Sequence, residues 1–206
     1  MNPTGCLLIW NDCAVGHEAE YESWYQEEHL PERMAVPGFV CGVRHRALDQ
    51  QSPHYMTYYE VKDPQVLQRA DYLALLEQPT PRTRRIMEVA FKNMNRTVCH
   101  LAHVRNGEPT PYVVTATGGA RWLDDLPVPE SALRVLALRA LPRGPATAEE
   151  ALRGGDTSVE AALVVHVTNP HEAEQLATAL NGRAWQQVAF AVGQHHDRGK
   201  SQSSSF

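Results

Sequence analysis

A run of aromatic and acidic residues near the N-terminus constrains the fold of this chain more than any other feature. It reads EYESWYQEEHLPER over residues 20–33, and Val36-Pro37-Gly38-Phe39 follows it closely. Apolar residues three and four positions apart lie on one face of an α-helix, whereas a Pro-Gly pair marks a turn. We therefore predict an amphipathic helix over residues 16–35, kinked or restarted at Pro31, and then a turn and a strand. The stripe on this helix and its edge consist of Tyr21, Trp24, Tyr25, Glu28 and His29.

The first half of the chain alternates between strand-like and helix-like segments. Their order is strand, helix, strand, strand, helix, strand. The segments that predict this order lie at residues 5–11, 16–35, 38–48, 53–61, 63–76 and 95–104, with a further helical stretch at 83–91. A βαββαβ order is ferredoxin-like, because an antiparallel sheet then carries both helices on one face. The other face keeps apolar residues that need cover, either from a second subunit or from a second copy within the chain.

The second half repeats short motifs of the first half in the same order. RAL at residues 46–48 recurs at 139–141, and VKDP at residues 61–64 recurs as VTNP at 167–170. Similar motifs in the same order indicate an internal duplication. The sequence leaves open whether the two halves close a barrel within one chain or between two chains.

The second copy is degenerate. Residues 121–126 allow a turn or two of helix where the first half has its aromatic helix, and an insertion with Pro and Gly occupies residues 142–156. We therefore expect an α+β fold in which two ferredoxin-like repeats pack sheet to sheet as an α/β barrel. The expected units are residues 1–105, with the candidate site, and residues 110–197, followed by a disordered tail over residues 198–206.

Composition excludes several classes of protein. The formal net charge is -5 and the pI is near 6.0, so we expect neither nucleic acid nor a membrane surface as a partner, since both need a basic field. No run of about 18 apolar residues predicts a membrane span, and the N-terminus does not read as a secretory signal, which favours a cytoplasmic protein. The cysteines form no C-x-x-C pair and are expected to be free thiols without a metal site.

The predicted helix carries the motif WYxxEHLP over residues 24–31, and the strand after the Pro-Gly turn ends in RHR at residues 44–46. These residues resemble the EthD-like members of the dimeric α/β-barrel superfamily. The resemblance covers residues 5–103 and continues weakly in the second half. It implies two ferredoxin-like sheets face to face, a closed interior, and pockets between each sheet and its helices. Similar proteins include cofactor-free polyketide cyclases, muconolactone-type isomerases, quinone-forming monooxygenases and haem-binding relatives, so the fold alone does not choose the activity.

An ionisable pair beside aromatic rings is how a small apolar pocket acquires a proton donor or acceptor. Glu28 and His29 supply such a pair, and polar residues of the expected strands, such as Arg44 or Tyr58, would project from the sheet toward them. The candidate catalytic residues are therefore His29, Glu28, His100 and Tyr58. The candidate substrate-binding residues are Trp24, Tyr25, Tyr21, Arg44 and Arg96. The alternative is structural: Glu28 pairs with an arginine, and His29 caps the end of the helix.

The leading interpretation is an enzyme that uses no organic cofactor and no metal. Proton-transfer chemistry of the isomerase, cyclase or lyase type on an aromatic or polyketide-like metabolite suits the candidate residues. The expected partners are this small-molecule substrate and a second copy of the chain, as a homodimer. One alternative is a non-enzymatic ligand-binding or assembly module in which the aromatic helix is core. A further alternative is a haem-binding or monooxygenase-type relative, and haem would need an axial ligand such as His171.

Overall fold

The computed structural model describes residues 2–124 and 129–193, so the predicted tail at 198–206 lies outside the described residues. The strands are β1 (Gly5–Cys13), β2 (Phe39–Ala47), β3 (Tyr55–Val61), β4 (Phe91–Arg105), β5 (Tyr112–Gly118), β6 (Arg134–Ala140), β7 (Ala161–Val167) and β8 (Arg183–Val192). The α-helices are α1 (Glu18–Trp24), α2 (Leu30–Ala35), α3 (Ala70–Glu77), α4 (Pro81–Val89), α5 (Ala148–Leu152) and α6 (Pro170–Ala179). A π-helical turn covers Tyr25–His29, and 3-10 turns cover Pro64–Gln68 and Trp122–Asp124.

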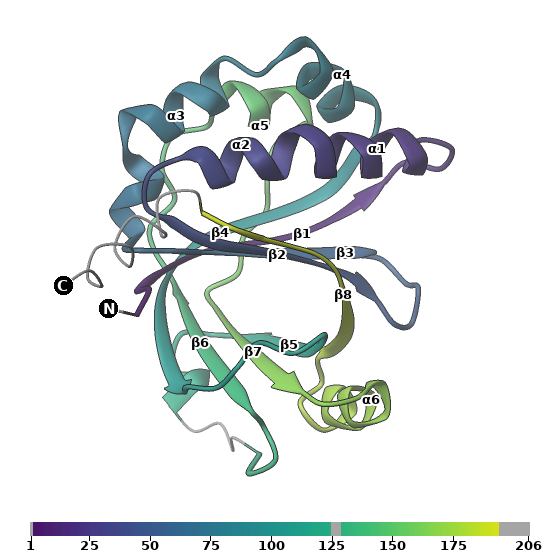
Figure 1. The fold of residues 1–206 in the computed structure, drawn as a ribbon, viewed down its shortest axis with the longest axis vertical. Coiled ribbons are helices and arrows are strands. Elements are labelled where there is room, and N and C mark those ends of the chain that lie inside the picture. Colours follow the sequence, from purple (N-terminus) through teal and green to yellow (C-terminus); the bar gives the residue numbers. More distant parts are fainter. Residues whose placement is uncertain (1, 125–128, 194–206) are drawn as a thin grey trace, which may run out of the picture.

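The strands form one closed antiparallel barrel (Figure 1). Their order around the barrel is β1-β3-β2-β8-β5-β7-β6-β4. The two halves of the chain meet at two seams, where β2 pairs with β8 and β4 pairs with β6. The predicted α+β class and barrel are therefore confirmed, and the barrel closes within a single chain. Closure removes the long exposed edges of an open sheet, to which another chain could add a strand.

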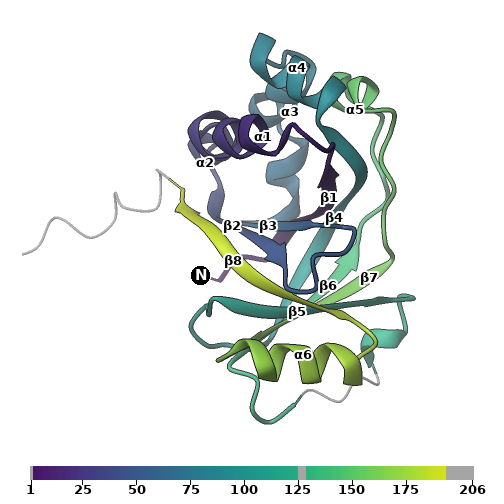
Figure 2. The ribbon, with the colours of Figure 1, turned by 90° about the vertical axis from the view of Figure 1, so that its right-hand side faces the viewer.

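Helices cover two opposite sides of the barrel (Figures 1 and 2). The helices α1 to α4 lie over the sheet of β1 to β4, whereas α6 packs on β5, β7 and β8. The short helix α5 belongs to the insertion of the second half, yet it crosses to the first half and contacts α3 and α4. Where the first half has its aromatic helix, the second half has the 3-10 turn Trp122–Asp124, in agreement with the short helical turn predicted there.

Side chains alternate between the barrel interior and its outer face along each strand. In β1, Leu8 and Trp10 belong to the interior core, whereas Leu7 and Ile9 belong to the core beneath the helices. Apolar side chains from both halves fill the interior, including the fully buried Trp185 of β8. The barrel is therefore a packed core rather than a channel. Open space is found at one end of the barrel and beneath the helices.

The helix predicted from the aromatic segment is interrupted by the π-helical turn. The amide of Leu30 donates to the carbonyl of Tyr25, five residues earlier, and the helix then restarts as α2 with a proline in its first turn, as predicted. The extra residue in the turn places His29 against Trp24, with 4.4 Å between ring centroids. Glu28 is displaced from the centre of the stripe. The arrangement expected from an ideal helix is therefore wrong for these two ionisable residues.

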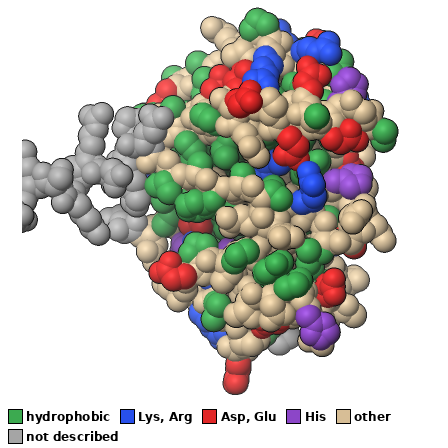
Figure 3. All heavy atoms as spheres, turned by 45° about the vertical axis from the view of Figure 1, so that its right-hand side comes forward, with side chains coloured by type: hydrophobic (Ala, Val, Ile, Leu, Met, Phe, Trp, Pro, Cys, Tyr) green, Lys and Arg blue, Asp and Glu red, His purple; other side chains and the backbone are tan. Residues whose placement is uncertain are grey.

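The surface mixes acidic and basic side chains. On the face shown in Figure 3, Lys and Arg side chains lie among Asp and Glu side chains rather than in one basic area. This distribution agrees with the formal net charge of -5. Within residues 2–124 and 129–193, no helix is both long and apolar enough to cross a lipid bilayer.

Candidate functional site

The aromatic stripe of the first helix lies in the core between the helices and the sheet. Tyr21, Trp24 and Tyr25 are all buried. The rings of Tyr21 and Trp24 pack edge-on against Phe91 of β4, and the indole N–H of Trp24 donates to Oγ1 of Thr83 at 3.0 Å. These contacts make the predicted substrate-binding stripe part of the protein core, although Tyr25 also borders a small cavity.

Arg44 projects from β2 toward the helices, as predicted, and is fully buried. Its guanidinium carbon lies 4.4 Å from the ring centroid of Tyr25 and 4.3 Å from that of Tyr55. Its Nη1 donates to Oε2 of Glu22 on α1 at 2.6 Å. Aromatic faces and a carboxylate thus stabilise this buried charge, so Arg44 has partners within the protein.

Glu28 faces α4 rather than a pocket. Its Oε1 accepts hydrogen bonds from the hydroxyls of Thr80 and Thr83, the latter at 3.1 Å. Nη1 of Arg82 lies 3.9 Å from Oε2 of Glu28. Glu28 therefore ties the first helix to α4, in line with the structural alternative for this residue.

His29 is buried, and its Nδ1 has no hydrogen-bond partner among the described residues. Burial lowers the pKa of His29 well below its ordinary value, and the positive charges of Arg33, Arg153 and Arg44 lower it further. The imidazole is therefore neutral near pH 7. It borders a small cavity of about 20 Å³, far smaller than ligand pockets of roughly 300–1,000 Å³. The residues that border this helix–sheet cavity include Tyr25, His29, Arg33, Tyr72, Arg96 and Arg153.

The remaining predicted residues come from strands and do not converge on one pocket. Arg96 reaches the helix–sheet cavity, as predicted. Tyr58 points into the barrel interior, where its hydroxyl lies 3.3 Å from Nε2 of His166. The expectation that Tyr58 projects toward the helices is therefore wrong, because strand alternation puts it on the inner face. His100 is exposed on β4 and does not border the helix–sheet cavity.

Two buried histidines of the barrel interior make the free energy of unfolding depend on pH. Burial lowers the pKa of His45 to about 3, and the nearby His166 adds to this effect; burial together with Arg134 lowers the pKa of His166 to about 3. An unfolded histidine has a pKa of about 6.5. Unfolding below that pH therefore takes up protons, and the free energy of unfolding falls as the pH falls from about 6.5 toward 3.

We expect His45→Gln to reduce the loss of stability between pH 7 and pH 5 by about 2 kcal/mol. The reason is that glutamine takes up no proton on unfolding. Urea unfolding at the two pH values measures the difference, with His171→Gln, an exposed histidine of α6, as the control. An unchanged pH dependence in His45→Gln would contradict the linkage to this residue.

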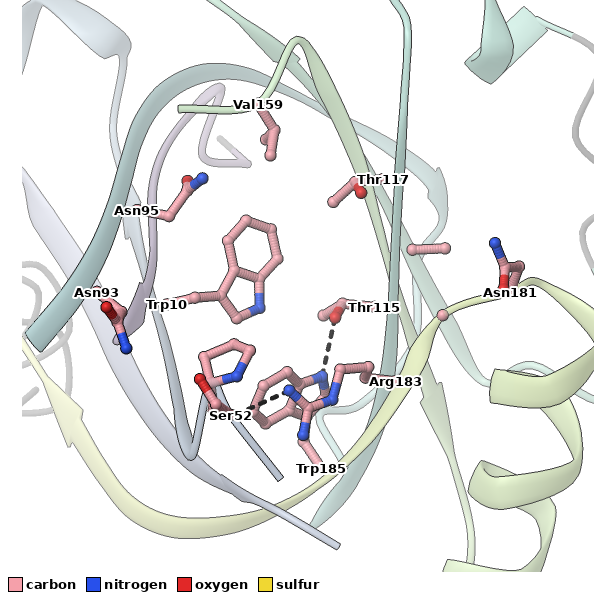
Figure 4. Close-up of a pocket in the computed structure, with 13 residues that line it drawn as sticks. Trp10, Ser52, Asn93, Asn95, Thr115, Thr117, Val159, Asn181, Arg183 and Trp185 are labelled. Carbon is pink, nitrogen blue, oxygen red and sulfur yellow. Dashed lines mark hydrogen bonds between the residues drawn. The ribbon is translucent and has the colours of Figure 1, made fainter. Parts of the chain in front are cut away.

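A larger open space lies at the end of the barrel where β1 ends and β4 begins (Figure 4). Its volume is about 420 Å³, within the range of small-molecule sites. Its apolar walls are Trp10, Pro53, Val159 and Trp185. Its polar side chains include Ser52, Asn93, Asn95, Thr115, Thr117 and Arg183. This barrel-mouth pocket therefore draws residues from both halves of the chain.

Two hydrogen-bond donors of the barrel-mouth pocket are available to a ligand. Oδ1 of Asn95 accepts from Oγ1 of Thr97 at 3.2 Å, and the amide nitrogen of the same side chain has no partner within the described parts of the chain. The same holds for the indole N–H of Trp10, whereas that of Trp185 donates to Thr115 at 2.8 Å. A planar molecule that carries carbonyl or hydroxyl oxygens matches these aromatic walls and donors.

Asp12 lies behind the wall of the barrel-mouth pocket and holds three residues in place. Its carboxylate accepts hydrogen bonds from the hydroxyl of Ser52, from Nδ2 of Asn93 at 2.8 Å, and from the amide and Nδ1 of His54 at 2.7 and 2.6 Å. Burial acts to raise the pKa of Asp12, but these hydrogen bonds outweigh it and hold the pKa below its ordinary value. Nδ1 of His54 is bonded to Asp12, and the His54 ring is half-exposed.

The sequence did not point to the barrel-mouth pocket. The available signals were the Ser52-Pro53 turn between two strands and the Asn93-x-Asn95 pair. Turns and asparagines of this kind are common at strand ends, so neither signal indicates a site by itself. Their significance appears when the closed barrel brings them beside Trp185, which lies far away in the sequence.

No family model matches the sequence, and none of the curated proteins matches it. Solved structures match nearly the whole chain. An anthrone oxidase-like protein has 9% identity and a TM-score of 0.55, over 100% of this chain and 98% of its own. A Fusobacterium nucleatum protein described as a monooxygenase has 10% identity and a TM-score of 0.50, over 93% and 96%. A protein described as a chlorite dismutase has 9% identity and a TM-score of 0.51, over 92% and 96%.

This chain has their α/β-barrel fold. At 9–10% identity the likeness shows the fold alone, and none of these comparisons shows EthD-like membership. The leading interpretation, an isomerase, cyclase or lyase, is wrong: these structures are described as oxidative enzymes or a chlorite dismutase. The geometry agrees with this correction, because Glu28 is bonded to α4 and the cavity beside His29 is too small for a metabolite.

Haem fits neither the barrel-mouth pocket nor the helix–sheet cavity. Haem iron is held by an axial His, Cys, Met or Tyr, and none of these residue types lines the barrel-mouth pocket. The helix–sheet cavity borders His29 but measures about 20 Å³. His171 is exposed on α6 and its Nε2 is bonded to Gln175 at 3.0 Å. Across the residues that the structure describes, no group of three or more His, Cys, Asp or Glu is placed to hold a metal ion.

Proposed function

We propose that this protein catalyses the O2-dependent oxidation of a planar aromatic small molecule bound in the barrel-mouth pocket. The observation that carries the proposal is the pocket itself, with about 420 Å³ of space, two indole rings and donors for ligand oxygens. The structural neighbours support oxidative chemistry, above all the anthrone oxidase-like protein that matches 100% of this chain. The hydrogen-bonded pair Asp12–His54 behind the pocket wall favours an enzyme over a binding module.

The chemistry proposed for this site takes all its electrons from the substrate. A methylene group beside an aromatic ketone or phenol loses a proton to a base, and the resulting anion passes electrons to O2. In the complete reaction, one methylene group and one molecule of O2 give one ketone and one molecule of water. Two C–H bonds break, one oxygen atom enters the carbonyl group, and the other leaves as water with the two hydrogen atoms. Because the methylene carbon supplies every electron, the proposed reaction needs no organic cofactor.

His54 does not itself border the barrel-mouth pocket. In this proposal it is the general base and takes the substrate proton through one bridging water molecule. Its Nδ1 is bonded to Asp12 at 2.6 Å, and the carboxylate stabilises the imidazolium that forms when Nε2 takes the proton. The amide of Asn95 and the indole N–H of Trp10 donate to the substrate oxygen on which negative charge develops. The buried ring of Trp185 supplies a second aromatic wall behind Arg183, whose guanidinium carbon lies 4.9 Å from the ring centroid.

We also infer that the barrel consists of two ferredoxin-like repeats, within the expected units 1–105 and 110–197. Residues 1, 125–128 and 194–197 of these units lie outside the described residues. The strand orders β4-β1-β3-β2 and β6-β7-β5-β8 are the two halves of the barrel, read from seam to seam. The helical segments that follow β3 and β7 also begin alike. The side chains of Asp63 and Asn169 each accept a hydrogen bond from a backbone amide, and each residue precedes a proline. EthD-like membership, a homodimer and a cytoplasmic location stay predictions from the sequence. The proposed site draws all its residues from one chain.

Oxygen uptake with anthrone as the probe tests the proposed function. With EDTA-treated protein we expect O2 consumption above the rate in buffer and, under oxygen-18 gas, one labelled oxygen in the ketone product. Asn95→Ala is expected to lower kcat about 100-fold, as the loss of one donor to an oxyanion does. Asn106→Ala, in an exposed loop, is the matched control. Wild-type consumption equal to the rate in buffer would contradict the proposal.

A further inference from the structure

The helix–sheet cavity is lined by more cations than anions. Three buried or largely buried guanidinium groups reach it, from Arg33 of α2, Arg96 of β4 and Arg153 after α5. Nη2 of Arg33 is paired with Oε1 of Glu149 at 2.6 Å. Arg153 is paired with Asp156 at 2.6 Å and lies 3.8 Å from Glu149. Arg96 is paired with no carboxylate among the described residues, so one positive charge of this group stays uncompensated.

Hydrogen-bond donors of the cavity also lack acceptors. Nη1 of Arg33 is buried and has no partner in the described parts of the chain. Nδ1 of His29, a donor in one of the two neutral tautomers, has none there either. Arg96 donates one hydrogen bond, from Nη2 to the hydroxyl of Tyr72 at 3.0 Å. A buried donor without an acceptor is costly. An acceptor placed in the cavity would therefore stabilise the folded protein.

The size of the cavity limits what can enter it. About 20 Å³ accommodates one group the size of a water molecule. A carboxylate, a phosphate or an aromatic ring is excluded by volume. A water molecule fits by size, but it leaves the excess positive charge in place. An ion of one atom with negative charge satisfies the size, the charge and the donors together.

We propose that the helix–sheet cavity is a binding site for a small monovalent anion of halide size. The anion would accept hydrogen bonds from Nη1 of Arg33 and from Arg96, and would lie beside the ring of His29. It would also hold α2, β4 and the segment after α5 to one another, because Arg33, Arg96 and Arg153 belong to these three elements. This site is separate from the barrel-mouth pocket and does not depend on the proposed oxidation.

The thermal stability of the substrate-free protein in different sodium salts tests the anion site. At constant ionic strength, replacing gluconate by chloride or bromide is expected to raise the Tm by about 3 °C when the halide is tenfold above its Kd. Gluconate is too large for the cavity. Arg69→Gln is the control, because Arg69 forms an exposed pair with Asp71. The control should show the same halide effect as the wild type.

Two variants change the charge of the cavity in opposite directions. Arg96→Gln removes the uncompensated charge and keeps both buried ion pairs, so we expect the protein to fold and the halide effect to disappear. Glu149→Gln removes one negative charge from the cavity and releases Nη2 of Arg33. The halide effect should therefore grow and saturate at a lower halide concentration. An equal halide effect in both variants would overturn the proposal. The measurement uses no substrate, so failure of the proposed oxidation cannot affect it.

Anomalous diffraction from crystals grown in sodium bromide gives an independent answer. We expect a bromide peak in the helix–sheet cavity, within hydrogen-bond distance of Arg33, and no such peak in Arg96→Gln. A cavity that holds water alone, with bromide confined to the surface, would overturn the proposal even if the protein were stabilised by halides.

Discussion

Replacing Trp24 by alanine is expected to lower the free energy of unfolding by about 4 kcal/mol. Trp24 is fully buried, and its indole ring lies 4.4 Å from the ring of His29 and 5.6 Å from that of Tyr25. The substitution would leave a cavity between α1 and the sheet, and it would remove the donor to Thr83. Urea unfolding followed by far-UV circular dichroism measures the change.

Trp24→Phe is the matched control for the packing of this ring. It keeps an aromatic ring and loses the indole N–H, so its effect should be smaller, about 1–2 kcal/mol. The substitutions also separate two roles for Trp24. A substrate-binding role predicts a change in KM with little change in stability, whereas the packed ring predicts the reverse. An alanine variant as stable as the wild type would contradict the packing described for the first helix.

The loss of His54 is expected to have the largest effect on turnover. His54→Gln should lower kcat by roughly 100- to 10,000-fold with anthrone as the probe, the range associated with a general base. Its ring is half-exposed, so the urea midpoint should change little. His17→Gln is the control, because His17 is also partly exposed and lies near an acidic residue, Glu20, at 3.7 Å. Full activity in His54→Gln would remove this residue from the mechanism.

Much of the fold could be predicted because the sequence patterns that indicate its strands and helices are local. The strands β1, β2, β3 and β4 appear in the sequence as apolar segments between turns, and Asp63 caps the helical turn that follows β3. The repeated motifs indicated a duplication, but they left open whether the two halves close the barrel within one chain. Strand boundaries differ by a few residues, since the strands continue as long as a neighbour offers hydrogen bonds. β4, for example, begins at Phe91 because its first residues pair with β1.

The candidate site was less predictable because it depends on contacts between distant segments. Arg33 and Glu149 are 116 positions apart, yet they form a buried ion pair at 2.6 Å. The π-helical turn is another example, because ideal helical spacing puts Glu28 inward and His29 at the edge, whereas the turn reverses them. No local sequence pattern predicts either feature. Both arise when the helices pack on the sheet.

The insertion of the second half changes what the first half can do. Its helix α5 crosses to α3 and α4, and Glu149 and Arg153 then help to close the helix–sheet cavity. The predicted pocket beneath the aromatic helix is thereby reduced to about 20 Å³. The space for a metabolite lies instead at the end of the barrel, where Trp10 of the first half and Trp185 of the second half both line the pocket.

A crystal structure with bound anthraquinone, the ketone expected from anthrone, tests the proposed site most directly. We predict ring density in the barrel-mouth pocket, against Trp10 and Trp185, with a carbonyl oxygen at the amide of Asn95. Density beneath the first helix, beside His29, with the barrel mouth empty, would contradict this placement and the oxidation proposed there.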